Sequence, residues 1–381
     1  MTEPAYRAAR AVAATVEAHF ARRLARAERM GRTGLASEPD APVVESIIDA
    51  AFWASLRREE GYSPKISLAF LPPEQAGQPL RFEHRLPLNP SALVRLAPAV
   101  ERPGIHLGVW RDAEELYVWG TTRTVPPLCF VLEVVDPGLL VVKYRRGHET
   151  GKFINVVVLK GDQIKMVDEE GASLPDCPAV VTSLIGFGVP AASSSDDSVK
   201  VLVQLAASMR AHGRGGILLV VPRGTERWRE SIVAPISYSV SPAYSELAEL
   251  MSADESERSL QTWQEALTDA VDAVAGLTAV DGATLITDKY ELLAFGAKIR
   301  RREGGAQVEQ VVVTEPVVGG APSFVHPSHL GGTRHLSAAQ FVHDQRDALA
   351  LVASQDGRFT VFAWSPCEQM AHAHRVETLL L

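Results

Sequence analysis

The residues best suited to chemistry lie in three short segments of the C-terminal half of the chain. The first is Asp281-Gly282-Ala283, which leads into an apolar run at 284–286. The second is Thr333-Arg334-His335 at the start of a helical pattern, and the third is Ser354, directly after the apolar run 348–353. A carboxylate beside a strand, a basic pair at a helix start and a hydroxyl after a strand are groups from which a phosphate and metal site is built.

Each segment has a distinct chemical capacity. The Asp281 carboxylate is a hard oxygen ligand suited to Mg²⁺ or Mn²⁺, and the following glycine permits close backbone approach to a ligand. The N-terminus of a helix favours anions, and the Arg334 guanidinium can form paired hydrogen bonds with phosphate oxygens. His335 can donate to the same oxygens or bind a metal. Taken singly, each segment is more often a plain turn or helix start.

Rival motifs are weaker. His326, His329, His335 and His343 could suggest a metal hydrolase, but the HExxH spacing is absent. A Ser-His-Asp hydrolase lacks its GxSxG turn. The glycine-rich segment 213–216 precedes a strand, whereas a P-loop follows a strand and opens a helix.

Composition restricts the function classes. The 381 residues carry a net charge of −8 and a pI of about 5.8, which disfavours a bulk nucleic-acid binder. The three cysteines form no CxxC pair and fit a reducing compartment. No apolar run approaches the roughly 18 residues that span a bilayer, and no signal-peptide pattern opens the chain. We therefore expect a soluble, cytoplasmic protein that does not enter membranes.

The N-terminal half predicts helices followed by short strands. Apolar spacing indicates helices at 4–30 and 43–58, and Asn89 with Pro90 indicates a helix at 90–97. Trp110 and Trp119 are expected in the core of this mostly β domain, with an aromatic platform for a base as the alternative. β-Branched and aromatic runs predict strands at 66–70, 105–110, 116–119, 128–134, 139–144 and 153–159.

The C-terminal half alternates helices and apolar strands after a Gly-, Ser- and Asp-rich boundary at 186–198. This alternation argues for an α/β sandwich. The pattern predicts helices at 198–211, 243–251, 258–275 and 333–345, and strands at 216–221, 284–287, 292–298, 308–314, 348–353 and 359–364.

The combined motifs resemble the diadenylate cyclase (DAC) domain family. The matching residues are Asp281-Gly282-Ala283, then Gly332-Thr333-Arg334-His335, then an apolar strand ending at Ser354-Gln355. The resemblance covers roughly residues 198–365. With it, the chain divides into N-terminal helices (1–60), a β-rich sensor-like domain (61–185), a DAC-like nucleotide-binding domain (198–368) and a tail (369–381). The fold class is thus an α/β DAC-like domain, a mixed sheet flanked by helices, preceded by an α+β, mostly β, domain.

The resemblance implies a site for ATP or a cyclic dinucleotide. Asp281 would bind Mg²⁺ or Mn²⁺ near an attacking hydroxyl, and Gly282 and Ala283 would lie beside the ribose. In the family, two domains face each other, and two ATP molecules condense into cyclic di-AMP with loss of pyrophosphate. Synthesis by this chain would therefore need a homodimer, whereas the oligomeric state itself stays open. Phosphates would be held by Thr333, Arg334, His335, Ser337 and Ser354.

The chain departs from the family at Leu336, where the family motif has a second arginine. A lost charged hydrogen bond costs about 1.5–3 kcal/mol, which weakens the case for turnover more than the case for binding. The basic run Arg300-Arg301-Arg302 is a candidate to compensate, with a solvated strand end as the alternative. The added β-rich domain is similar to a diverged, sensor-like branch of the family. The leading hypothesis is therefore a nucleotide-binding sensor or regulatory module. An active diadenylate cyclase is the alternative, and a non-binding scaffold is the third hypothesis.

Overall fold

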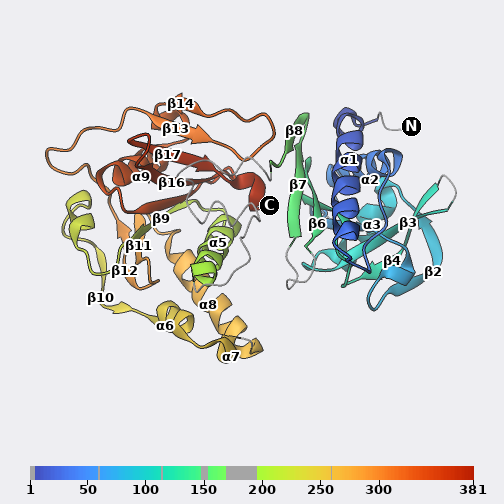
Figure 1. Cartoon of the computed structure of the whole chain (residues 1–381), viewed down its shortest axis with the longest axis horizontal. Coiled ribbons are helices and arrows are strands. Elements are labelled where there is room, and N and C mark those ends of the chain that lie inside the picture. The colour runs from blue at the N-terminus through green and yellow to red at the C-terminus, as the bar shows by residue number, and fades with distance from the viewer. Residues whose placement is uncertain (1–4, 59–60, 113–114, 147–152, 169–194, 259) are drawn as a thin grey trace. The chain divides into compact units, whose positions relative to one another are not determined.

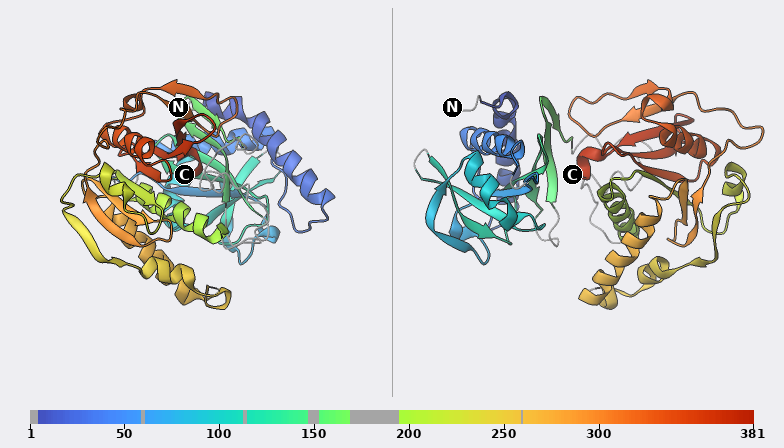
Figure 2. Two further views of the ribbon diagram at one scale, coloured as in Figure 1. Left: turned by 60° about the vertical axis from the view of Figure 1, so that its left-hand side comes forward. Right: turned by 180° about the vertical axis from the view of Figure 1, so that it is seen from behind.

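A computed structural model describes residues 5–58, 61–112, 115–146, 153–168, 195–258 and 260–381. The chain forms two compact units, one of Met1–Val167 with Leu381, the other of Asp168–Leu380. Each unit has its own mixed β-sheet and its own helices (Figures 1 and 2). The predicted boundary at 186–198 lies outside the described residues, apart from the start of the helix that follows it.

The first unit is an eight-stranded sheet with three helices packed on it among the described residues. Its helices are α1 (Arg7–Arg29), α2 (Ala41–Ser55) and α3 (Pro90–Val100). The sheet order is β2-β4-β3-β1-β5-β6-β7-β8, with β1 and β3 parallel. The strands are β1 (Ile66–Phe70), β2 (Leu80–Pro87), β3 (His106–Asp112), β4 (Glu115–Thr122), β5 (Phe130–Asp136), β6 (Leu139–Arg145), β7 (Phe153–Lys160) and β8 (Gln163–Met166). A short 3₁₀ helix, η1 (Pro73–Gln75), precedes β2.

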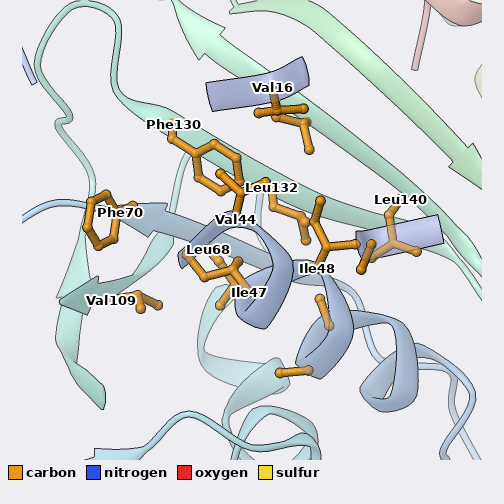
Figure 3. Packing of buried hydrophobic residues seen from close by; sticks show 14 of the residues in the cluster. Val16, Val44, Ile47, Ile48, Leu68, Phe70, Val109, Phe130, Leu132 and Leu140 are labelled. Carbon is orange, nitrogen blue, oxygen red and sulfur yellow. The ribbon is translucent and has the colours of Figure 1, made fainter. Parts of the chain in front are cut away.

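Capping and apolar spacing explain these helices. The Asp40 side chain accepts a hydrogen bond from the Val43 amide at the start of α2, and Asn89 accepts one from Ala92 at the start of α3. The buried face of α2 packs on β1 and β5 in the core of this unit, where side chains of the three elements point toward one another (Figure 3). The helix predicted at 90–97 and the expected burial of Trp119 are confirmed.

The second unit is a nine-stranded sheet between helices. Its order is β10-β12-β11-β9-β15-β16-β17-β13-β14. The strands are β9 (Gly216–Val221), β10 (Tyr238–Tyr244), β11 (Ala283–Thr287), β12 (Leu292–Ala297), β13 (Val311–Thr314), β14 (Ser323–Val325), β15 (Leu349–Ala353), β16 (Phe359–Ser365) and β17 (Met370–Arg375). The helices are α5 (Ser195–Ala211), α6 (Glu246–Ser252), α7 (Glu255–Arg258), α8 (Gln261–Leu277) and α9 (Thr333–Asp344), with 3₁₀ turns η2 (Arg227–Ser231), η3 (Pro327–His329) and η4 (Glu377–Leu379).

Two apolar clusters cover the two faces of this sheet. One joins α5 and α8 to side chains such as Leu218, Ile286 and Leu351. The other joins α9 to their strand neighbours, Leu219, Leu285 and Val352. Alternate residues of the same strands therefore enter opposite layers, as the pleat requires. The prediction of a mixed sheet flanked by helices is confirmed at this level.

Two differences from the predicted elements have physical causes. Residues 369–381, expected as a tail, contain β17, which lies between β16 and β13. Its alternating alanine and histidine residues lack the β-branched composition that indicates a strand. The helix expected from 243 begins at Glu246, because β10 occupies 238–244. Pro242 is tolerated there because β10 is an edge strand.

No helix in the described part of the chain is long and apolar enough to cross a bilayer.

Candidate functional site

Strand pairing brings the predicted site segments to one end of the second sheet. Ala283 at the start of β11 pairs with Ile217 of the parallel strand β9. Gly216, one residue earlier in β9, pairs with Ala353 at the end of the antiparallel strand β15. Asp281 and Ser354 therefore flank the loop that enters β9, although 73 positions separate them in the sequence.

Asp281 presents an exposed carboxylate at this end of the sheet. Its side chain is 90% exposed, and Oδ2 accepts a hydrogen bond from Nζ of Lys298 at 2.5 Å. This hydrogen bond, together with the charge of Lys298, holds the pKa of Asp281 below its ordinary value, and the charge of Arg334 lowers it further. The acid and the arginine, which belong to separate motifs, thus act on each other electrostatically.

Gly282 is required by the backbone of the sheet. Its φ is +116°, and an added Cβ would lie 2.5 Å from the carbonyl carbon of Gly296 in β12. Ala283 is buried in the cluster under α9. The glycine therefore lets β11 and β12 approach closely. This close approach fixes the position of Asp281 directly before β11, at the end of the sheet.

Arg334 lies at the same end of the sheet, over the loop that enters β9. A Cβ added to Gly215 would lie 2.9 Å from Nη1 of Arg334 and 3.2 Å from the carbonyl oxygen of Ala353. No hydrogen bond or ion pair joins the guanidinium to another residue that the structure describes. Its donors are therefore free at the point where Asp281, Gly215 and the end of β15 meet.

The start of α9 offers further donors. Gly332 is the N-cap residue, and no side chain caps the helix. Thr333 is exposed, whereas Ser337, one turn further on, is half-buried. The first backbone N–H groups of a helix lack partners within the helix. The helix start therefore carries an uncapped positive end beside the Arg334 guanidinium.

His335 points into the protein. It is 2% exposed, lies edge-on to Phe362, and its Nε2 is 3.4 Å from Oγ1 of Thr360. Burial is the main cause that lowers its pKa, so the ring is neutral near pH 7. A Cβ added to Gly331 would meet Nδ1 at 2.3 Å, so only glycine leaves room for the ring. The imidazole packs the helix start against β16 and does not face the exposed surface on which Arg334 lies.

Ser354 belongs to a polar turn. Its amide donates to the carbonyl of Arg358, and its hydroxyl donates to Asp356. Burial alone would raise the pKa of Asp356, but hydrogen bonds from Ser354 and Arg358, with the charge of Arg358, keep it below the ordinary value. The turn is thus held in one conformation at the end of β15.

The other basic run lies away from this edge. Arg300 donates to the carbonyl of Glu230, and the amide of Arg302 donates to Asp344, the last residue of α9. Leu336 is half-buried and packs on the apolar cluster under α9. The basic run is therefore at the opposite end of α9 from Arg334, while Leu336 contributes to the core.

Three residues of the site escaped the sequence prediction as site residues. Lys298 pairs with Asp281, and Gly215 underlies Arg334. Beside the same loop, Oγ1 of Thr278 accepts a 3.1 Å hydrogen bond from Nε2 of His212, because Nδ1 of that ring accepts from the amide of Arg214. The glycine-rich segment before β9 was the available signal for Gly215. Among the described residues, no group of three or more His, Cys, Asp or Glu side chains forms a metal cluster.

Comparison with known protein families finds a match within the first unit. No curated protein matches the chain. Residues 33–123 match the model of a family described as "Probable sensor domain DACNV". That range runs from before α2 to the end of β4 and so includes β1, β2, α3 and β3. The N-terminal region of this chain is therefore a probable sensor domain of the DACNV family.

Proposed function

We propose that the second unit binds an adenine nucleotide, ATP or a cyclic dinucleotide, and that the chain is a sensor or regulatory protein. The observation that carries the proposal is the meeting of Asp281, Arg334, the start of β9 and the end of β15 at one end of the second sheet. The choice of adenine rests on the resemblance to the DAC family. The sensor role draws on the DACNV match of residues 33–123.

Arg334 and the start of α9 form the phosphate-binding part. The guanidinium has no carboxylate partner within hydrogen-bonding distance among the described residues, so a ligand phosphate does not compete with an internal ion pair. Backbone N–H groups of the uncapped helix start and the exposed Thr333 hydroxyl add neutral donors. The hydroxyl of Ser354, directly after β15, would have to leave Asp356 to donate to a phosphate. Ser337 is a further candidate donor from the first turns of α9, and His335 holds the helix start on β16.

Asp281 is the metal-binding part. A single exposed carboxylate fits Mg²⁺ or Mn²⁺, which usually takes one or two carboxylates and completes its shell with phosphate oxygens and water. Lys298 is paired with one carboxylate oxygen, Oδ2, and its positive charge repels a cation at the other. Metal binding should therefore depend on the nucleotide, whose phosphates supply further charge. Gly282 and Ala283 would lie beside the ribose.

Calorimetric titration tests the binding proposal. Full-length protein is titrated with ATP, with and without Mg²⁺, and with cyclic di-AMP. Arg334→Ala should weaken binding at least about tenfold, the scale of a lost charged hydrogen bond. The matched control is Arg301→Ala, which removes an exposed arginine of the basic run and should leave affinity unchanged. Absence of binding by every nucleotide would leave the scaffold hypothesis, and equal losses in both variants would indicate unspecific charge attraction.

Product analysis separates sensing from synthesis. The exposed Asp281 carboxylate beside Arg334 is the observation that favours an active cyclase. In that reaction the 3′-hydroxyl of each ATP attacks the α-phosphorus of the other, and two pyrophosphates leave. Formation of cyclic di-AMP with Mn²⁺ or Mg²⁺, and its loss in Asp281→Asn, would establish the cyclase. Binding without product supports the sensor.

A further inference from the structure

The first unit contains a cavity, open on one side, that shares no residue with the proposed nucleotide site. Its volume is about 450 Å³, and it lies between η1 and strands β2, β3 and β4. This volume lies within the 300–1,000 Å³ range of small-molecule sites. The whole cavity falls inside the 33–123 segment that matches the sensor family. Its lining consists of Pro73, Glu74, Arg81, Phe82, Glu83, Arg85, Trp110, Arg111, Asp112, Tyr117 and Trp119.

A large irregularity in the sheet creates this cavity. Arg81 of β2 is opposite Gly120 of β4, but Leu86 is opposite Val118. Five steps along β2 therefore correspond to two along β4, and residues 82–85 bulge away from the ladder. Such bulges often lie next to functional sites. Gly120 permits the irregularity, because its φ is +156° and an added Cβ would lie 1.9 Å from the carbonyl oxygen of Leu80.

Aromatic rings held in fixed positions line the cavity. Trp110 stacks on Phe70 with ring centroids 4.8 Å apart, and Trp119 donates from Nε1 to the carbonyl of Leu71 at 2.8 Å. Gly108 makes room for the Trp119 ring, since an added Cβ would lie 2.1 Å from it. The Arg85 guanidinium lies 4.4 Å from the centroid of Tyr117. Rigid rings offer flat faces to a planar ligand at low entropic cost.

Three arginines supply anion-binding groups at the rim. Arg81 pairs with Glu74 at 3.2 Å, Arg85 pairs with Asp112 at 2.6 Å, and Arg111 pairs with Asp40. Each pair is solvent-exposed, so each contributes only about 0–1 kcal/mol and can be exchanged. Each guanidinium uses one nitrogen in its pair, and the remaining N–H donors stay available. The carboxylates thus hold the arginines in place without consuming their donors.

Glu83 sets a limit on ligand charge. It is exposed, lines the cavity, and forms no ion pair with another described residue. The lining carries three arginines and three acids, which disfavours a polyanion such as a triphosphate. A ligand N–H group would find an acceptor in the Glu83 carboxylate.

We propose that this cavity is the ligand-binding site of the sensor domain and that its ligand is a small planar molecule with one anionic group and N–H donors in the ring or attached to it. The ring stacks on Trp110 and Tyr117, the anion binds Arg85 and Arg81, and the N–H donors face Glu83. The anion is a carboxylate or a phosphate, and the probes below distinguish these two sources.

Fluorine NMR of full-length protein containing 5-fluorotryptophan tests the proposal. The Trp110 and Trp119 resonances are assigned with Trp110→Phe and Trp119→Phe. The probes are indole-3-carboxylate and AMP, which differ in the anion, at millimolar concentration. Indole without an anion and inorganic phosphate without a ring are the controls. A saturable shift of the Trp110 resonance with either probe, absent with both controls, is the expected result.

Matched variants locate the binding. Arg85→Ala, and separately Arg81→Ala, should weaken probe binding at least about tenfold. Arg95→Ala removes an exposed arginine from α3 and should change nothing, and Arg334→Ala should also leave the Trp110 shift intact. The undisturbed spectrum of each variant without probe reports its folding. No saturable shift with either probe, equal affinity in the arginine variants, or loss of the shift in Arg334→Ala would overturn the proposal. The last result leaves the proposed nucleotide site standing, so the two proposals fail separately.

Discussion

Nη1 of Arg334 lies over Gly215, 2.9 Å from the place where a Cβ would be. Gly215→Ala should therefore push the guanidinium away from the sheet edge, because the far end of an arginine moves more easily than backbone. We expect nucleotide affinity to fall, as in Arg334→Ala, in the same calorimetric titration. The cost in stability should be about 1–2 kcal/mol, since φ at Gly215 is +73°.

Gly213→Ala is the matched control for that substitution. Its φ is +64°, but an added Cβ meets no atom within 4 Å. It should carry a similar backbone strain with unchanged nucleotide affinity. If both variants lose affinity equally, the loop conformation and not the Arg334 contact determines binding.

Gly282→Ala should destabilise the second unit by about 3 kcal/mol. The added methyl group would collide with the backbone of Gly296, which cannot move without separating β11 from β12. Urea unfolding measures the loss. Gly276→Ala in α8, where nothing lies within 4 Å, should stabilise the protein by about 0.5–1 kcal/mol. Changes of the same sign in both variants would contradict this account.

Lys298→Met should raise the pKa of Asp281 toward its ordinary value. The hydrogen bond and charge of Lys298 are the two largest causes that lower it. The titration of the Asp281 carboxyl ¹³C resonance, assigned with Asp281→Asn, measures the midpoint. The Lys289→Met variant serves as the control for loss of a lysine from the same unit. An unchanged midpoint in Lys298→Met would show that Arg334 dominates the field at Asp281.

His374→Asn should reduce the acid sensitivity of the second unit. Burial, with the charge of His372, lowers the pKa of His374 from 6.5 to about 4. As the pH falls from 6.5 to 4, the unfolded chain binds a proton that the folded chain does not, so the free energy of unfolding falls. One such histidine accounts for up to about 3 kcal/mol.

Urea unfolding at a series of pH values checks this effect. The asparagine can keep the hydrogen bond that His374 makes with Thr314 at 2.8 Å. The slope should decrease without vanishing, because buried His335 has its pKa lowered too. His84→Asn, in an exposed position of the first unit, should leave the slope unchanged. An unaltered slope in His374→Asn would refute the assignment.

The sequence predicts the regular elements well where their signals are local. β9 was predicted with both ends correct, and the start of α9 at Thr333 follows from Gly332 and the apolar spacing. Edge strands were missed, because β2 and β10 are exposed and rich in charged, serine or proline residues. These strands are defined by pairing with distant strands, which no local pattern encodes.

The candidate site was predictable in part for a similar reason. Asp281 and Arg334 have chemically distinctive neighbours in the sequence, so their motifs can be recognised. Lys298 and Gly215 act only through contacts with residues 17 and 119 positions away, at Asp281 and Arg334. The inward orientation of His335 also depends on room left by Gly331 and on Phe362 of β16.

Because β9 lies in the middle of the second sheet, insertions and deletions should not be tolerated equally along the chain. The pairings of β9 with β11 and β15 alone set the relative height of Asp281 and Ser354. The segment between β9 and β11 also packs on this sheet, because β10 pairs with β12 and α8 lies against side chains of β9, β11 and β15. Insertions or deletions in its exposed turns, outside β10 and α8, should leave the site geometry intact. A single-residue insertion within β9 would reverse the faces of the following strand residues and separate the site. Insertions and deletions should therefore be tolerated in exposed connecting turns but not within the six-residue strand β9.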